Sequence, residues 1–315
     1  MPRMPQRFYE LVTCATATEL VDAISPTSGH FSNGDWIFRG QGRDLALVPS
    51  AYRRERMRPM KSRRFKDWSY LSQARAELKL VHRFYKIADR AGLSIPEDSY
   101  ELRTLLETVD RNREEFVRDW PPGQLLALIA LAQHHGVATR LLDWTHSPWV
   151  AAYFAAETVL NCTAAERTES RIVVWAFDAS IGIAVPANDE GDEDEVVWRT
   201  AGIVEVVTTP YGNNRNLAAQ RGVHLLYRLT DAPKPMARVR RDPFDHALQH
   251  AHAGAMKDYE KALFKFVLPP TEAEPLLRLL AKHGVTGATL FPGFDGVARA
   301  MAEEDACRLI KWPLA

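Results

Sequence analysis

A change of hydrophobic pattern halfway along the chain most constrains its fold. Before about residue 160, apolar residues recur at helical spacing, whereas after residue 170 they form short runs rich in β-branched and aromatic residues, as strands do. One strand is also predicted early, at residues 35–39, between two groups of turn residues. Because this strand needs a partner, we expect it to pair with the late strands, which predicts a single α+β domain over residues 1–315.

Local signals then divide the chain into helices and strands. Gly136 is the expected C-terminal cap of a buried apolar helix, and Thr145 or Ser147 is the expected N-terminal cap of the next helix, with Pro148 in its first turn. The predicted helices are residues 72–91, 100–120, 124–135, 148–160, 272–283 and a last helix after Gly296. The predicted strands are residues 35–39, 139–144, 171–177, 203–208, 223–229, 263–268 and 288–291.

The overall charge does not identify a partner, because 40 basic and 40 acidic residues give a formal net charge of zero. The charge is uneven locally, since residues 53–66 are strongly basic and residues 188–195 are strongly acidic. We expect both runs to be loops. The basic run could bind nucleic acid through phosphate contacts, although a solvated loop is the more common interpretation of such a run.

Cysteine usage and targeting signals indicate a cytoplasmic protein. The three cysteines are far apart and form no CxxC pair, which argues against a disulfide framework or a zinc site. No apolar run is long enough to span a bilayer, and the first residues lack the continuous apolar core of a signal peptide. We therefore expect a cytoplasmic protein with no membrane partner.

Arg39 and Asp143 are the charged residues with the strongest claim to a functional site. Arg39 ends the early strand and precedes Gly40-Gln41-Gly42, where a guanidinium can offer its planar fork to a phosphate or carboxylate. Asp143 lies inside an apolar run, so its carboxylate needs a partner. A ligand site and a structural Arg39–Asp143 ion pair both remain open, and for Asp143 the structural pair is favoured.

The histidines favour structural roles over metal binding. His134 and His135 lie at a helix end, where the negative end of the helix dipole favours a histidine, and no further ligands occur at matching spacing. His246, His250 and His252 contain an i,i+4 pair, but an exposed helical face is the more common explanation. We predict no metal site.

Four blocks of the sequence resemble the FRG domain family, which takes its name from a Phe-Arg-Gly motif. The first block is FRGQ at residues 38–41, and the second is QHHGVATRLLDWT at residues 133–145 with Ser147-Pro148 and AYFA at 152–155. The third is Arg215 with Asn216, Ala219-Gln220 and Gly222, and the fourth is residues 264–269 with Leu290-Phe291-Pro292 and Asp295-Gly296. The resemblance covers roughly residues 36–300, and its central block is long and specific.

The FRG pattern in turn resembles the motifs of the ADP-ribosyltransferase fold. That resemblance implies a core of one split, mixed or antiparallel sheet over about residues 30–300, with a helical elaboration at about residues 53–135. It also implies that NAD is the substrate and that the protein carries catalytic and NAD-binding residues on these blocks. The implied catalytic residues are Arg39, Asp143, Thr145 and Gln220. The implied NAD-binding residues are Arg39, Gly40, Gln41, His135, Thr139, Arg140, Trp144, Ser147 and Tyr153.

One residue departs from the transferase pattern. Gln220 stands where the transferases usually carry a glutamate that stabilises an oxocarbenium-like state, and a neutral amide stabilises positive charge less well. Asp143 could supply the missing carboxylate. The resemblance implies NAD-dependent ADP-ribosyl transfer to nucleic acid or protein, in a toxin or antiviral-defence setting with an antitoxin partner. An NAD hydrolase and a non-catalytic module that binds nucleotide or nucleic acid are the alternatives.

Overall fold

The computed structural model describes most of the chain, with several gaps. The described residues are 9–31, 34–53, 70–109, 120–180, 183–185, 188–189, 197–199, 202–212, 214–229, 238–239, 243–245 and 262–307.

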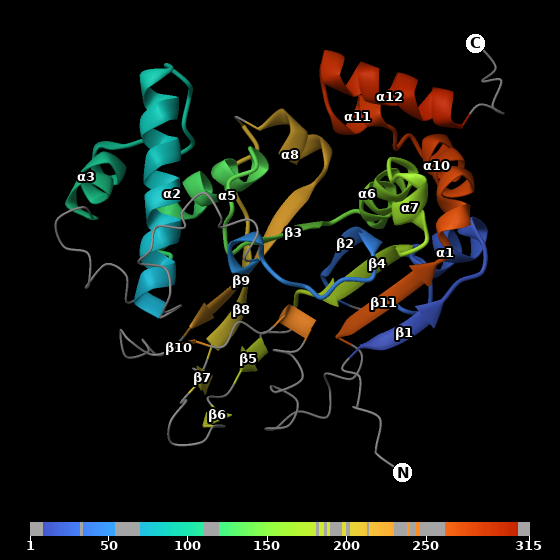
Figure 1. The fold of residues 1–315 in the computed structure, drawn as a ribbon, viewed down its shortest axis with the longest axis horizontal. Helices are drawn as coiled ribbons and strands as arrows, with labels where there is room; N and C mark the ends of the chain where they lie inside the picture. Colours follow the sequence, from blue (N-terminus) through green and yellow to red (C-terminus); the bar gives the residue numbers. More distant parts are fainter. Residues whose placement is uncertain are drawn as a thin grey trace.

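A mixed sheet of eight strands forms the centre of the described structure, in the order β1-β11-β4-β2-β3-β9-β8-β5 (Figure 1). Strands β1 and β11 are parallel, and every other neighbouring pair is antiparallel. A small second sheet has the order β10-β7-β6. The strands are β1 Glu10–Thr13, β2 Trp36–Arg43, β3 Leu142–Thr145, β4 Ser170–Asp178, β5 Ile183–Val185, β6 Asn188–Asp189, β7 Val197–Arg199, β8 Gly202–Val207, β9 Gly222–Leu229, β10 Arg238–Val239 and β11 Leu263–Leu268.

The eight-stranded sheet consists of two halves that meet at one point. Strand β2 pairs with β4 along most of its length, and β3 pairs with β9 at all four of its residues, Leu142 to Thr145. Between the two halves, β2 and β3 pair only where Phe38 lies opposite Thr145. The strands therefore diverge on either side of this pair, and the residues next to it are free to face a cavity rather than a neighbouring strand.

Helices cover the sheet on both sides of this junction (Figure 1). Helix α6 packs across β2 and β4, with α1 and α10 beside it, around one apolar core. Helices α2, α3 and α5 enclose a second core that reaches the β8–β9 end of the sheet. The helices are α1 Ala17–Ala23, α2 Tyr70–Arg90, α3 Tyr100–Val109, α5 Leu126–His134, α6 Pro148–Leu160, α7 Ala164–Arg167, α8 Arg215–Ala219, α10 Ala273–Lys282, α11 Gly287–Leu290 and α12 Phe294–Ala306, and the 3-10 turns are Ser50–Tyr52, Gly123–Leu125 and Pro270–Glu272.

The glycine of the FRG motif allows α6 to lie close to β2. A Cβ atom at Gly40 would be 1.8 Å from the backbone oxygen of Ala151, and one at Gly42 would be 2.5 Å from the Thr158 side chain. Both distances are too short for any carbon atom, so a side chain at either position would push the helix away. Gly40 therefore keeps the start of α6 next to Arg39 and Thr145, where the two halves of the sheet meet.

Replacing Gly40 with alanine is expected to destabilise the protein by about 1–3 kcal/mol, as overpacking does elsewhere. The matched control is Gly29→Ala, because a Cβ atom at Gly29 meets nothing within 4 Å. Urea denaturation of both variants measures the free energy of unfolding. Equal stability of the two variants would contradict the close approach of α6.

Most predicted elements agree with the structure to within a few residues. The structure confirms the 263–268 strand without change, the α2 and α10 helices, Gly136 with a φ of +83° after α5, and Ser147 as the N-cap of α6 with Pro148 behind it. The prediction of a strand at 35–39 was too short, because β2 continues through the glycines to Arg43. No element was predicted for β1 and α1, which precede it, although Thr16 followed by Glu19 is the N-cap pattern with which α1 begins.

Two local predictions were wrong, and others lie outside the described residues. Residues 288–291 form helix α11 instead of a strand, because Thr286 and Thr289 close a reciprocal capping box at its start. The acidic run is not all loop, since Asn188–Asp189 pairs with β7. Other predictions lie outside the described residues. They are the loop at residues 54–66, the second half of the 100–120 helix, the acidic run at residues 190–195, and the exposed helical face with His246, His250 and His252.

Candidate functional site

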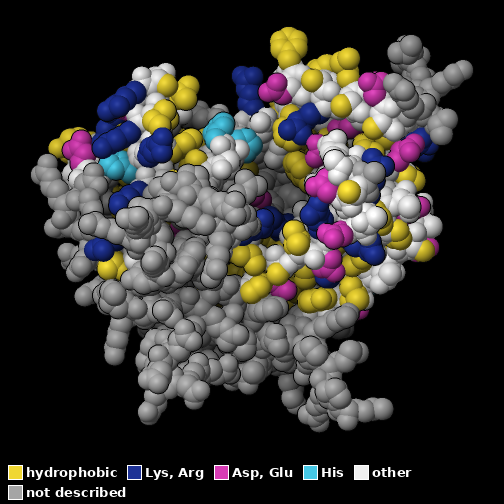
Figure 2. All heavy atoms as spheres, in the orientation of Figure 1, with side chains coloured by type: hydrophobic (Ala, Val, Ile, Leu, Met, Phe, Trp, Pro, Cys, Tyr) yellow, Lys and Arg dark blue, Asp and Glu magenta, His cyan; other side chains and the backbone are white. Residues whose placement is uncertain are grey.

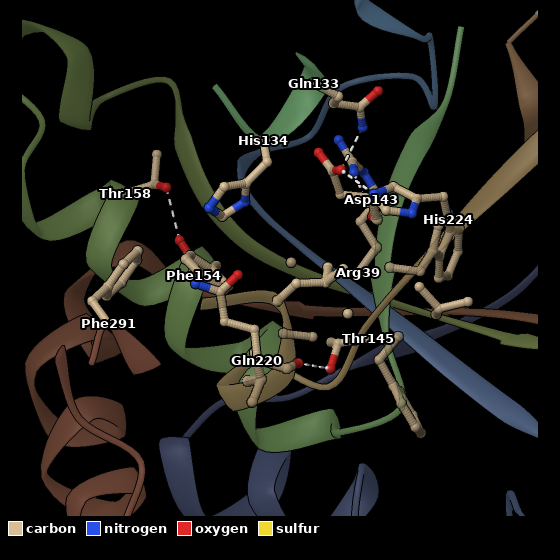
Figure 3. A pocket seen from close by; sticks show the side chains of 18 of the residues that line it. Arg39, Gln133, His134, Asp143, Thr145, Phe154, Thr158, Gln220, His224 and Phe291 are labelled. Atoms are coloured by element: carbon tan, nitrogen blue, oxygen red, sulfur yellow. Dashed lines mark hydrogen bonds and ion pairs between the residues drawn. The ribbon is translucent and has the colours of Figure 1, made fainter. Parts of the chain in front are cut away.

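A cavity of about 480 Å³ opens where β2 and β3 diverge, between α5, α6, α8 and the C-terminal helices. Figure 3 shows side chains from all of these parts extending toward one space. Of the residues implied as functional, six line this cavity: Arg39, Gly40, Asp143, Trp144, Thr145 and Gln220. The other described lining residues are Phe38, Gln133, His134, Val150, Ala151, Phe154, Thr158, Leu217, Gly222, Val223, His224, Phe291 and Arg299.

Arg39 bridges the two halves of the sheet. Its Nη1 donates a hydrogen bond of 2.6 Å to the backbone oxygen of Asp143, which orients the guanidinium along the gap between β2 and β3 (Figure 3). Its Nε is buried and has no hydrogen-bond partner among the described residues. Burial lowers the pKa of the guanidinium, which the Asp143 carboxylate opposes, but an arginine remains charged in proteins. Arg39 is therefore a fixed cation with donor capacity left for a ligand.

The predicted ion pair between the Arg39 and Asp143 side chains is replaced by a hydrogen bond from Arg39 to the Asp143 backbone. Arg39 binds the backbone carbonyl of Asp143, whereas the Asp143 side chain is 67% exposed and faces the cavity. The reason is the alternation of β3, which buries Leu142 and Trp144 on one side and turns Asp143 to the other. Asp143 is the only carboxylate among the described residues that line the cavity.

Two neighbours hold the Asp143 carboxylate. The Gln133 side-chain amide donates a hydrogen bond to it, and Thr139 donates to the carbonyl oxygen of the same amide, which fixes its orientation. On the adjacent strand, His224 lies opposite Asp143, with 3.5 Å between His224 Nε2 and the carboxylate Oδ1. Thr139 was implied as an NAD-binding residue, but it does not line the cavity and instead orients Gln133, which does.

His224 and His134 give the cavity two histidines that are neutral near pH 7. Burial lowers the pKa of His224, and the Asp143 carboxylate opposes this effect. Burial and the neighbouring His135 lower the pKa of His134. A neutral imidazole can accept or donate a proton within a cavity without adding to its positive charge.

Thr145 joins the second and third blocks of the resemblance. Its hydroxyl donates a hydrogen bond of 2.6 Å to the backbone oxygen of Gln220 and accepts one from the backbone nitrogen of Ser147 (Figure 3). The Gln220 side-chain amide donates to the backbone oxygen of Leu290 at 3.1 Å. Gln220 thus extends across the cavity toward the C-terminal helices, and its position depends on α11.

The opposite wall of the cavity is apolar and ends in a second cation. Phe154 and Phe291 meet edge to face, with 6.0 Å between their ring centroids. The Arg299 guanidinium carbon lies 4.1 Å from the Phe291 ring centroid, and Nη1 forms a 2.9 Å ion pair with Glu157. The cavity therefore has arginines from two distant parts of the chain, with aromatic rings beside one of them.

The remaining implied NAD-binding residues do not line the cavity. Gln41 is buried and accepts a hydrogen bond from the Trp175 indole. His135 stacks on Phe84, outside the cavity. Ser147 caps α6.

Arg140 and Tyr153 also have structural partners instead of the cavity. The Arg140 guanidinium is buried against Glu77, with a distance of 2.7 Å between Nε and Oε2. Tyr153 is fully buried, and its hydroxyl bonds to Glu303 on α12. Trp144 borders the cavity, but its ring packs on the far side against Phe177 and Phe244.

Sequence reasoning did not identify several of the lining residues. His224 had a local signal, since it is a polar residue in the apolar strand pattern of residues 223–229, and Gln133 is a polar residue near the end of an apolar helix. Phe291 belongs to the fourth block of the resemblance, which implied no role for it in the site, and Arg299 had no signal. Both reach the cavity only through the fold of the C-terminal helices.

Neither a metal site nor a membrane-spanning helix is found in the described part of the chain. No group of three or more His, Cys, Asp or Glu residues there could hold a metal ion. No helix built from those residues has both the length and the apolar character needed to cross a bilayer.

One comparison with known proteins finds a match. No curated protein matches the chain, and no solved structure does. The matched segment contains Arg39, Gly40, Asp143 and Thr145, and it ends before Gln220, His224 and the C-terminal wall of the cavity. Residues 34–163 match the FRG domain.

Proposed function

We propose that the cavity binds NAD and that the protein transfers ADP-ribose from it to an acceptor. The observation that carries this proposal is Arg39, whose buried Nε lacks a partner beside an open cavity. A planar guanidinium held in this way suits a diphosphate, because it forms charge-assisted hydrogen bonds to phosphate oxygens. The cavity volume of about 480 Å³ is also typical of small-molecule sites.

The arrangement of the three implied motifs supports the same proposal. Arg39 is on β2, Thr145 is on β3 and Gln220 precedes β9, and these three strands are neighbours in the sheet. Segments more than 170 residues apart in sequence, from Arg39 to Gln220, therefore surround one space. A site for cleavage of NAD needs a phosphate anchor and a group that orients the ribose within reach of each other.

In the proposed reaction, the bond between the ribose C1′ and the nicotinamide nitrogen breaks, and nicotinamide leaves with the bonding electrons. The ribose carries positive charge until an acceptor nucleophile forms a new bond to C1′ and loses its proton. Asp143 is the lining carboxylate that can stabilise this charge or take the proton. Gln133 and His224 keep it directed into the cavity.

Release of nicotinamide from NAD by the purified protein tests this proposal. Release that increases on addition of RNA, DNA or cell lysate is expected, and the additive that works identifies the class of acceptor. Release at the same rate without any addition would mean that water is the acceptor and that the protein is an NAD hydrolase. No release under any condition, from protein that is folded by circular dichroism, would exclude both reactions.

Replacing Gln220 with glutamate is expected to raise the rate of nicotinamide release by about tenfold, because a carboxylate stabilises a developing positive charge better than an amide. Gln220→Leu, which removes the polar group, serves as the matched control and is expected to lower the rate. The rates are measured at saturating NAD. A Gln220→Glu variant with lower activity than the natural protein would mean that the amide itself is required.

A non-catalytic nucleotide-binding module is the second candidate function. The hydrogen bond from the Gln220 amide to Leu290 favours it, because a neutral side chain engaged by the protein contributes little to catalysis. This function predicts NAD binding without any turnover. The toxin or defence role and the antitoxin partner remain predictions of the resemblance.

A further inference from the structure

One face of helix α2 carries a straight row of positive charges. Lys79, Arg83, Lys86 and Arg90 follow one another at i, i+4, i+7 and i+11, which places them on one side of a helix. All four are exposed. We call these four residues the α2 basic stripe. Figure 2 shows Lys and Arg side chains gathered over α2.

No described carboxylate forms an ion pair with the stripe. The ion pairs in this region use other arginines: Arg103 binds Asp89 and Asp98, and Arg140 binds Glu77. The four charges therefore lie close together without a described ion pair of their own, since their neighbour Asp89 is bound by Arg103. Such a row attracts a polyanion, and the attraction weakens as salt is added.

The opposite face of α2 limits what the stripe can bind. That face is buried in the second apolar core, through Ala74, Leu78, Val81 and Tyr85. Ile87 is the one large apolar side chain of α2 among the exposed hydrophobic residues. A single side chain is not the continuous apolar face with which a membrane-binding amphipathic helix enters a lipid surface. The stripe also lacks an exposed aromatic side chain, which the centre of a protein–protein interface usually provides.

The length and regularity of the stripe suit a phosphate backbone. From Lys79 to Arg90 the helix rises by about 16 Å, since each residue adds about 1.5 Å. Each strand of a duplex places one phosphate about every 3.4 Å along the duplex axis, so the stripe spans several of them. Lysine and arginine without base-reading or stacking side chains make contacts that position a nucleic acid without selecting its sequence.

The stripe and the cavity are connected through α5. His135, at the end of α5, stacks on Phe84 of α2, and the preceding residue, His134, lines the cavity. In Figure 2 the basic side chains over α2 lie on the same face of the molecule as the hollow between α5 and α6. A strand bound along α2 can therefore reach this hollow without crossing the molecule.

We propose that the α2 basic stripe binds the backbone of a nucleic acid and presents it to the cavity as the acceptor. The binding step stands on the stripe alone, whereas the acceptor step rests on the proposed transfer of ADP-ribose. In that step C1′ of the ribose loses nicotinamide and bonds to a nucleophilic atom of the nucleic acid, whose proton goes to Asp143.

The test compares oligonucleotide binding by the natural protein and by the triple variant Lys79→Gln, Arg83→Gln, Lys86→Gln. Glutamine keeps the helix propensity of these positions and removes three charges. Fluorescence anisotropy with labelled RNA and DNA of mixed sequence, at several salt concentrations and without NAD, gives the affinity and its salt dependence. We expect the triple variant to bind at least about tenfold more weakly, with the slope of log K against log salt reduced by about 3.

A second triple variant controls for net charge. It carries Arg167→Gln, Arg171→Gln and Lys282→Gln, which remove three exposed charges from other parts of the surface. We expect it to bind oligonucleotides as the natural protein does. If the natural protein does not bind, or if both triple variants weaken binding equally, the stripe is not a nucleic-acid site, whatever the protein does to NAD. Tighter binding of polyglutamate than of any oligonucleotide would assign the stripe to an acidic protein instead.

The acceptor step has its own measurement. Mass spectrometry of the oligonucleotides after incubation with NAD is expected to detect an added ADP-ribose, which the stripe variant loses. Nicotinamide release in the absence of nucleic acid should be unchanged in that variant, because the stripe is outside the cavity. Bound but unmodified oligonucleotide, from protein that cleaves NAD, would overturn the acceptor step alone.

Discussion

Replacing Arg39 with alanine is expected to weaken NAD binding by about 100-fold and to remove detectable nicotinamide release. A charge-assisted hydrogen bond contributes about 1.5–3 kcal/mol, and loss of two of them costs about 3 kcal/mol, which corresponds to a factor of about 100. The Arg39 Nε has no partner among the described residues to lose. Among the described residues, Arg39 gives up one hydrogen bond, to the Asp143 backbone, so the effect on ligand binding should exceed the effect on the free energy of unfolding.

Three further variants make this test specific. Arg39→Lys keeps the charge without the planar fork, and we expect an affinity between those of the natural protein and the alanine variant. Arg171→Ala removes an exposed arginine that does not line the cavity, and it should leave NAD binding unchanged. Gln133→Leu leaves Arg39 in place and releases one hydrogen bond to Asp143, so it should lower turnover more than binding.

Calorimetric titration with NAD measures the affinity, and urea denaturation confirms that each variant is folded. If Arg39→Ala binds NAD as tightly as Arg171→Ala does, the free Nε of Arg39 serves something other than a nucleotide, and the proposed site is wrong. If Arg39→Ala binds NAD more weakly and the natural protein itself releases no nicotinamide, the protein is a nucleotide-binding module without catalytic activity.

The sequence was sufficient to predict the elements whose signals are local. Alternating or continuous apolar runs located β4, β9 and β11, and the cap residues Gly136 and Ser147 located the ends of α5 and α6. The prediction failed for α11, where two threonines form a capping box within a segment that also suits a strand. Local hydrogen bonds decided that segment, and residue propensities alone could not reveal them.

The site was predictable only in part, because proximity along the chain is a poor guide to the direction of a side chain. Arg39, Asp143, Thr145 and Gln220 do line one cavity. Their neighbour Arg140 is turned away from it, into a buried pair with Glu77, a residue 63 positions earlier in the chain. No feature of the sequence pairs these two residues, since the pairing depends on how α2 packs against the segment before β3.

For Arg140, a structural role and a role in NAD binding can therefore be separated by experiment. Burial alone would lower the pKa of Arg140, but the Glu77 carboxylate outweighs this effect and raises it. The same carboxylate accepts hydrogen bonds from the Trp120 indole and the Gln73 amide. Four side chains from α2 and two later segments thus share one buried network, which a single substitution can disrupt.

Replacing Glu77 with alanine is expected to lower the free energy of unfolding by about 3–5 kcal/mol, because it leaves the Arg140 charge buried without its counter-charge. The double variant Glu77→Met, Arg140→Met removes both charges and fills a similar volume, so it should recover most of this loss. Urea denaturation measures both effects. A Glu77→Ala variant as stable as the natural protein would mean that water or another group replaces the carboxylate.

The double variant also decides the role that the FRG resemblance implied for Arg140. If Arg140 only supports the fold, the folded double variant should bind and cleave NAD as the natural protein does, because neither residue lines the cavity. If Arg140 takes part in NAD binding, the double variant should fold and yet lose affinity, as Arg39→Ala is expected to do. Calorimetric titration of the double variant and of Arg39→Ala separates these outcomes, because both proteins are measured under conditions in which they are folded.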